Sequence, residues 1–154
     1  MNRYFEKISF ERFKKDIKDD IELYNSYNIP IRETKHAAGY DFESLEDFII
    51  KPGEIKKIPT GIKVNMFDDE VLLLIVRSSM GFKYNVRLCN QVGVIDKDYY
   101  NNLNNEGHIY LSLKNEGIND YVVKKGDYIC QGLFVKYLVT DNEEEKYIER
   151  TSDY

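Results

Sequence analysis

Two short stretches of the sequence combine side chains that could hold a phosphate or activate a water molecule. In "VRSSMG" (76–81), Arg77 is followed by Ser78 and Ser79, directly after the most apolar run of the chain. Arginine presents a planar fork of donors to phosphate oxygens, and hydroxyls can donate beside it. A serine turn would explain the same residues. In "GVIDKDYY" (93–100), two aspartates and two tyrosines follow an apolar run, and a turn explains one of the four.

Two further stretches place polar residues where the pattern does not require them. Gln131 interrupts the apolar pattern of "GDYICQG", and "AAGYDF" sets a glycine and Asp41 beside a tyrosine, where a turn is the simplest interpretation. His36 and His108 lie in polar surroundings without a Gly-x-Ser-x-Gly turn, and no Gly-rich loop joins a strand to a helix. The sequence therefore argues against a Ser-His-Asp hydrolase and against a βαβ nucleotide site.

The elements that must position these residues are mainly strands. From residue 31 onward, short apolar runs alternate with turn residues, as in "DFIIKPGEIKKIPTGIKV" and "DDEVLLLIVR", which is typical of an all-β sandwich or barrel. Ser9 is a suitable N-cap for a short amphipathic helix before this body. The apolar residues at helical spacing behind it are Phe10, Phe13, Ile17 and Ile21.

Length and composition limit the classes of protein. The 154 residues fit one domain, with an N-terminal helical extension (1–29), a β core (30–139) and a polar tail (140–154). A net charge of −5 without a basic stripe argues against a nucleic-acid partner. The pattern of the sequence indicates neither a signal peptide nor an apolar run of about 18 residues, so we expect a cytoplasmic protein with no membrane partner. Cys89 and Cys130 are expected to be reduced thiols in or near the core.

Four stretches, taken in order, resemble four motifs of the trimeric dUTPase family: "AGYDF", "RSSMG", "LCNQVGVIDKDYY" and "GDYICQG". The likeness covers about residues 30–139. "IPTGI" (58–62) also looks like a strand of that family. The resemblance implies a jelly-roll-like distorted β-barrel that hydrolyses dUTP to dUMP and pyrophosphate with Mg²⁺. Most members read Tyr-Arg-Gly-Glu where this chain has "YYNNLNNEG", which indicates a longer loop and leaves the catalytic positions intact.

The resemblance assigns the base, the sugar and the water to one motif. By similarity, Asp96 orients the attacking water as general base. The Tyr99 ring lies against the deoxyribose and excludes a 2′-hydroxyl, while Tyr100 has no assigned role. Asn90 reads the edge of uracil, because a carboxamide offers both a donor and an acceptor. The backbone of the same motif, including Gly93 and Ile95, completes the substrate-binding set.

By the same resemblance, residues of the other motifs bind the phosphates. Ser78 would donate near the scissile bond, and Arg77 would hold Asp96 or a phosphate as negative charge grows. Ser79 and Gln131 would contact the substrate. The resemblance also implies Mg²⁺ held mainly by the phosphates.

The metal and the remaining aspartates follow from the same resemblance. Asp41 is expected to reach the waters that Mg²⁺ retains. Asp98 is assigned mostly to a turn, and Asp127 to a structural hydrogen bond.

Assembly and the chain end are further expectations. Members of the family form homotrimers in which one chain gives the third motif to a site and another gives the first, second and fourth. Members also carry a Gly-rich arm that closes over the nucleotide. Glu149, Arg150 and Thr151 resemble its approach, but the Gly-rich motif is missing from the sequence given, either naturally or by truncation. A chain without this lid is expected to bind dUTP and hydrolyse it slowly.

Two other functions stay open at this stage. A nucleotide-sensing or repressor-binding relative could keep the pocket and lose turnover, although a pure binder would not need Asp96. A deoxycytidine triphosphate deaminase shares the β fold, but it would need a catalytic glutamate, and none stands next to "LCNQV".

Overall fold

The computed structural model describes residues 1–150, and most of their regular structure is strand. Residues 151–154 of the predicted tail, including Thr151 at the expected approach to an arm, lie outside the described residues. The helices are α1 (Phe10–Asp16), α2 (Ile21–Ser26), α3 (Ser78–Tyr84) and the 3-10 helix η1 (Lys97–Tyr99). The strands are β1 (Tyr4–Lys7), β2 (Tyr40–Glu43), β3 (Phe48–Ile50), β4 (Ile55–Pro59), β5 (Ile62–Asn65), β6 (Glu70–Ile75), β7 (Val86–Leu88), β8 (Gly93–Asp96), β9 (Tyr110–Asn115), β10 (Tyr121–Val123) and β11 (Tyr128–Lys136).

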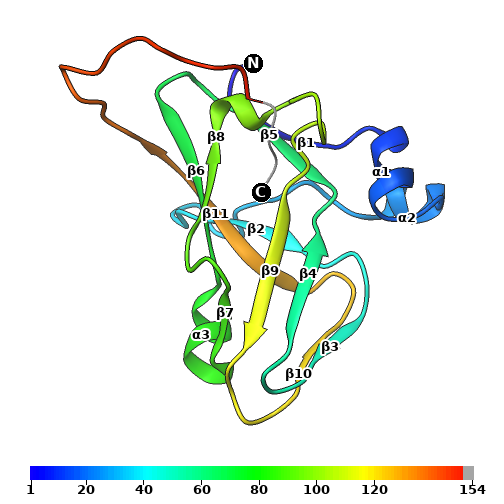
Figure 1. Ribbon diagram of the computed structural model, residues 1–154. Coiled ribbons are helices and arrows are strands. Elements are labelled where there is room, and N and C mark those ends of the chain that lie inside the picture. The colour runs from blue at the N-terminus through cyan, green and yellow to red at the C-terminus, as the bar shows by residue number, and fades with distance from the viewer. Residues whose placement is uncertain (151–154) are drawn as a thin grey trace.

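The strands of the described part form four antiparallel sheets. The largest has the order β2–β11–β6–β8, and the second has the order β4–β9–β7 (Figure 1). Two smaller pairs, β1–β5 and β10–β3, complete the arrangement. The all-β prediction is therefore confirmed, but these strands do not close into the barrel that the resemblance implied, because they divide among separate sheets.

β6 has a neighbouring strand on each edge, so its residues give a common register for the strands that carry Gln131 and Asp96. It pairs with β11 along one edge and with β8 along the other. Gln131 lies opposite Ile75, whereas Asp96 lies opposite Val71. Four residues of strand span about 13 Å. The two polar residues therefore lie at opposite ends of β6.

The core lies between the two larger sheets. Leu111 and Leu113 of β9 are buried and alternate with less buried neighbours, as the two-residue period of a strand requires. Leu72 and Leu74 of β6 belong to the same apolar cluster. Each buried leucine contributes roughly 1.5–3 kcal/mol relative to an exposed one, so this layer holds the sheets in place.

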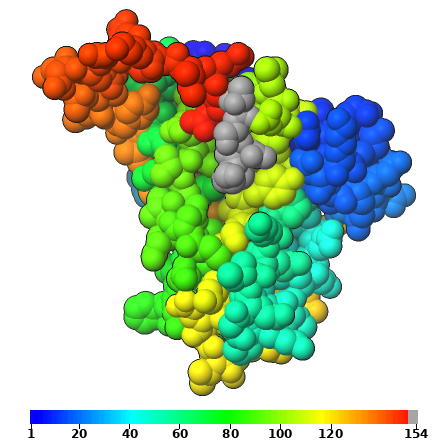
Figure 2. All heavy atoms as spheres, viewed as in Figure 1, coloured from blue at the N-terminus to red at the C-terminus, as the bar shows by residue number. Residues whose placement is uncertain are grey.

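The N-terminal segment forms two short helices where one was expected, and a strand precedes them. Ser9 caps α1 as predicted, and the Asp20 carboxylate caps α2. The division changes the helical phase, so Phe13 is fully buried while Ile21 is 48% exposed. β1 pairs with β5, and Figure 2 shows the helical part of the segment (blue) against one side of the body.

A buried histidine joins this segment to the body. The Nε2 atom of His108 accepts from the Gly61 N–H at 2.9 Å, and its Nδ1 atom lies 2.7 Å from Asp16 Oδ2. Because Nε2 accepts, the proton of the neutral ring is on Nδ1 and is donated to Asp16. Burial lowers the pKa of His108 below its ordinary value, although Asp16 opposes the shift. The polar surroundings inferred for His108 from its sequence neighbours are present, but they are internal, because the side chain is buried with a polar partner at each ring nitrogen.

The helices and the two cysteines can be set against the expectations for a membrane span and for reduced thiols. Within residues 1–150, no helix has the length and apolar character needed to cross a bilayer. Cys130 is buried and Cys89 is partly buried, and both are free thiols as expected.

The buried His108 predicts a pH-dependent stability. The unfolded chain binds a proton at His108 near pH 6.5 whereas the native chain resists it, so the free energy of unfolding should fall as the pH drops below about 6.5. One proton gives a slope of up to about 1.4 kcal/mol per pH unit. Urea unfolding between about pH 7.5 and 5.5 should show this slope in the wild type and in His36→Gln, which alters the other, exposed histidine. An equal slope in His108→Gln would contradict the assignment.

Candidate active site

An apolar cavity of about 370 Å³ lies beside β8, and three of the predicted substrate-binding residues line it. Asn90 stands in the turn between β7 and β8, while Gly93 and Ile95 come from β8 itself. A Cβ atom at Gly93 would lie 3.0 Å from the Leu74 Cβ atom, so glycine lets β8 pack closely on β6. The lining of this β8 cavity is Lys57, Leu74, Leu88, Cys89, Asn90, Gly93, Ile95, Tyr110, Leu111 and Ser112.

Several lining residues were not predicted from the sequence. Tyr110 and Ser112 belong to β9, and the Ser112 hydroxyl donates to Cys89 Sγ at 3.3 Å. Their spacing of two residues places them on one face of a strand. The sequence does not show that β9 pairs with β7, which brings this face to the cavity.

A second group of predicted residues, the Arg77 cluster, consists of Asp41, Arg77 and Gln131. Asp41 of β2 lies opposite Gln131 of β11, so it is in a strand and not in the turn that its sequence suggested. Arg77 Nε lies 3.1 Å from Asp41 Oδ1, and Gln131 Nε2 donates to the Val76 carbonyl at 3.3 Å. The structure therefore brings together polar residues from three of the four motifs.

Charge and burial oppose each other at Asp41. The residue is 8% exposed, and this burial raises the pKa of its carboxyl above the ordinary value. The Arg77 guanidinium counteracts the shift, and Glu33 adds to it. Asp41 is thus an acidic group whose charge depends on a nearby cation.

Ser78 and Ser79 extend the Arg77 cluster toward solvent. They begin α3, a helix that the sequence analysis did not expect, and Arg77 occupies its N-cap position. Both serines are exposed. Their hydroxyls are consequently accessible to a ligand that approaches Arg77 from outside.

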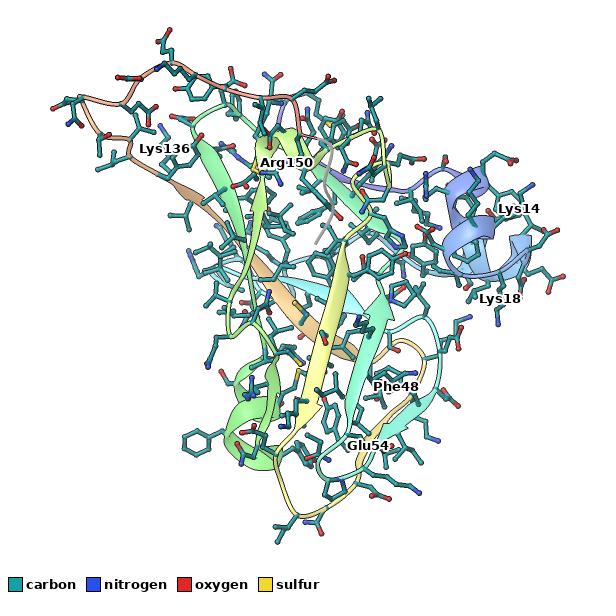
Figure 3. The ribbon with its side chains drawn as sticks, viewed as in Figure 1. Lys14, Lys18, Phe48, Glu54, Lys136 and Arg150 are labelled. Atoms are coloured by element: carbon teal, nitrogen blue, oxygen red, sulfur yellow. The ribbon has the colours of Figure 1, made fainter. Side chains whose placement is uncertain are left out.

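Asp96 lies apart from the Arg77 cluster, at the end of β8. Its Oδ2 atom is 2.5 Å from Arg150 Nη2, and the neighbouring Asp98 Oδ1 atom is 2.6 Å from Arg150 Nε. The C-terminal segment leads away from β11 and returns to this point, where Figure 3 labels Arg150. The Asp98 turn residue thus has an ionic partner, and Arg150 is a contact of the predicted base that sequence reasoning did not find.

Tyr99 follows in η1 and is 3% exposed. Its hydroxyl donates to the His108 carbonyl at 2.6 Å and accepts from Asn105 Nδ2 at 2.7 Å. Tyr100 has a different environment, because its hydroxyl donates to the Glu6 carboxylate. Of the two tyrosines, Tyr99 is the one fixed by the loop that follows it.

A family model described as dUTPase matches residues 25–154. The chain belongs to the dUTPase family. The resemblance seen in the four motifs is therefore confirmed.

Relatives and solved structures agree with this membership. A deoxyuridine 5′-triphosphate nucleotidohydrolase of Lactococcus lactis subsp. lactis (strain IL1403) is 48% identical over 128 residues, covering 82% of this chain and 85% of the relative. One from Haemophilus influenzae (strain PittEE) is 36% identical over 119 residues, 75% of each chain. The crystal structure of dUTPase from Streptococcus mutans gives a TM-score of 0.73 at 44% identity, covering 91% of this chain and all of that one.

A more distant structure supports the fold. The dUTPase of phage phi11 of S. aureus is 20% identical with a TM-score of 0.69, covering 97% of this chain and 99% of that chain. The predicted jelly-roll-like fold of the dUTPase type is thus confirmed, apart from the closed barrel.

The magnesium ion that the dUTPase resemblance implies would need carboxylates or water-holding residues in the described part of the chain. Residues 1–150 contain no group of three or more His, Cys, Asp and Glu side chains that could hold a metal together. Mg²⁺ commonly binds through one or two carboxylates, several waters and substrate phosphates. Asp41 in the Arg77 cluster fits such a role through water.

Proposed function

We propose that this protein hydrolyses dUTP to dUMP and pyrophosphate, with Mg²⁺ bound to the triphosphate. The names of the Lactococcus and Haemophilus relatives support the reaction class. The observation that carries the proposal is strand β8, on which Gly93 and Ile95 line the cavity and Asp96 follows directly. Asp96 projects from the opposite face of β8, so we place the base at the sheet edge that β8 forms, where its sugar and first phosphate would lie within reach of Asp96.

The base is selected at Asn90. Its exposed carboxamide offers a donor and an acceptor to the imide edge of uracil, with the Gly93 and Ile95 backbone beside it. Cytosine presents a different order of donors and acceptors. Its binding would bury polar groups of Asn90 and the β8 backbone without partners, and this cost disfavours it.

Asp96 orients the water that attacks the α-phosphorus and accepts its proton. The Arg150 guanidinium holds this carboxylate, but the Asp96 side chain is 49% exposed. Exposed ion pairs contribute typically about 0–1 kcal/mol, so opening this one for the water costs little.

The phosphates are bound by a second copy of the chain. Gln131 of the Arg77 cluster and Asp96 are offset by about 13 Å along β6, too far for one chain to act on a single α-phosphate. A homotrimer in which β8 of one chain faces Arg77, Ser78, Ser79 and Gln131 of another would complete the site. Their donors would stabilise the negative charge that grows in the transition state.

A magnesium ion would be held mainly by the phosphates of the substrate. A mutant dUTPase from phage phi11 of S. aureus coordinates a structural Mg(II) ion. In this protein Asp41 would hold waters of a magnesium ion that neutralises the triphosphate. We place the cation on the side of the Arg77 cluster.

The general-base role predicts the behaviour of Asp96→Asn. The amide keeps the shape but lacks basicity, so pyrophosphate release from dUTP should fall by roughly 10²-fold or more while a non-hydrolysable dUTP analogue still binds. Asp98→Asn removes the same charge two residues away, from a carboxylate that also contacts Arg150, and should keep most of the turnover. Equal losses in both variants would point to Arg150, not to a general base. The wild type should release pyrophosphate from dUTP and leave dCTP and UTP intact.

The sugar selection predicted for Tyr99 can be tested in the adjacent pair of tyrosines. Tyr99→Ala removes the ring that is proposed to exclude a 2′-hydroxyl, so the preference for dUTP over UTP in kcat/KM should shrink by about tenfold or more. Because the ring is 3% exposed and belongs to the core, thermal unfolding of the variant is measured beside the kinetics. Tyr100→Ala is the matched control and should retain the preference. The reverse result would move the sugar gate to Tyr100.

The shared site predicts that two inactive variants restore activity when mixed. Subunits of Asp96→Asn and Arg77→Ala, exchanged through mild denaturant, should form trimers in which about one quarter of the sites combine two intact halves. A mixture of Asp96→Asn with Asn90→Ala is the control, because both changes affect the same half. Recovery in neither mixture would mean that one chain supplies the whole site.

A further inference from the structure

The loop of residues 101–108 holds Tyr99 at its hydroxyl end. The Tyr99 hydroxyl donates to the His108 carbonyl at 2.6 Å and accepts from Asn105 Nδ2 at 2.7 Å. Asn102 Nδ2 donates to the Tyr99 carbonyl at 2.8 Å. The tilt of the ring therefore follows the position of this loop.

The loop adopts a backbone that needs support. Asn101 and Glu106 have φ values of 55° and 65°, which non-glycine residues rarely adopt. Gly107 has φ 88°, and a Cβ atom there would lie 2.8 Å from the Tyr99 carbonyl oxygen. Such conformations persist where surrounding contacts fix them.

The N-terminal segment supplies this support at two points. Ser9 donates to the Glu106 carboxylate from its backbone N–H at 2.7 Å and from its hydroxyl at 2.6 Å. Asp16 accepts from Nδ1 of His108 at 2.7 Å. Figure 2 shows the blue segment beside the yellow-green loop. Asp16 thus reaches the same residue whose carbonyl holds the Tyr99 hydroxyl.

The two N-terminal residues lie outside the part of the chain that the dUTPase family model matches, which begins at residue 25. The Asp16 side chain is 13% exposed and His108 is fully buried. A buried, hydrogen-bonded connection transmits a displacement more rigidly than a surface contact does. The N-terminal segment is therefore connected to the predicted sugar site by packed groups.

We propose that Asp16 is a positioning residue for sugar selection, acting through His108 on the orientation of Tyr99. The inference rests on the proposed function, because it takes Tyr99 as the platform for deoxyribose. When Asp16 is lost, the His108 ring and the loop end can shift, and the Tyr99 ring no longer fills the space of a 2′-hydroxyl. Misplacement of a positioned group by about 1 Å can cost up to roughly 10²-fold.

The test compares kcat/KM for dUTP and UTP in variants of the N-terminal segment. Asp16→Ala should lower the dUTP/UTP ratio by about tenfold, mainly through improved use of UTP. Asp16→Asn keeps an oxygen that accepts from Nδ1 and should retain a ratio near that of the wild type. Lys14→Ala, which removes a partly exposed ion pair with Glu11 on the same helix, is the control for a general effect on α1. Thermal unfolding of each variant separates stability from selectivity.

A second variant keeps the test valid if Asp16→Ala does not fold. Tyr99→Phe removes the hydroxyl alone and should lower the ratio in the same way, and combining it with Asp16→Ala should add little, because both break one connection. A lower unfolding temperature with an unchanged ratio in Asp16→Ala, or an unchanged ratio in Tyr99→Phe, would overturn the inference. If the wild type does not hydrolyse dUTP, or if Tyr99→Ala keeps the preference, the proposed function or the Tyr99 role fails instead.

Discussion

The pairing of β6 with β8 on one edge and β11 on the other sets the distance between the two halves of the candidate site. Leu72 and Leu74 of β6 are buried in the core. A slip of one residue would turn both to the opposite face, so burial of apolar surface fixes the register. The separation of Asp96 from Gln131 is thus a consequence of core packing and not of any contact between site residues.

The two carboxylates at these ends have opposite environments. Asp41 is buried against Arg77, so its ionised form depends on a cation beside it. Asp96 is half exposed and pairs with Arg150 from the C-terminal segment. Water screens the second pair and leaves its carboxylate free to exchange partners. A buried carboxylate beside a cation agrees with the proposed binding of a metal hydrate, whereas an exchangeable carboxylate agrees with the proposed general base.

The sequence was sufficient to predict the all-β fold, and the residues that it named for each half of the candidate site stay a prediction. Alternation along "GVID" puts Gly93 and Ile95 on one face of a strand with Asp96 at its end. Local patterns could not predict contacts between distant residues, such as His108 with Asp16 or Asp96 with Arg150. The single N-terminal helix was wrong because Asp20 can cap a second one, and the helical period alone does not show where the first helix ends.

Both ends of the described chain converge on residues 96–108. The N-terminal segment binds Glu106 and His108, while Arg150 binds Asp96 and Asp98. Segments outside the sheets therefore border the half of the site that would hold base, sugar and water. The Arg77 cluster, in contrast, is built on β2, β11 and the start of α3. Packed strands tolerate little displacement, but segments held by a few polar contacts can shift. Changes at the chain ends would consequently alter the proposed selectivity at β8 while the Arg77 cluster keeps its geometry.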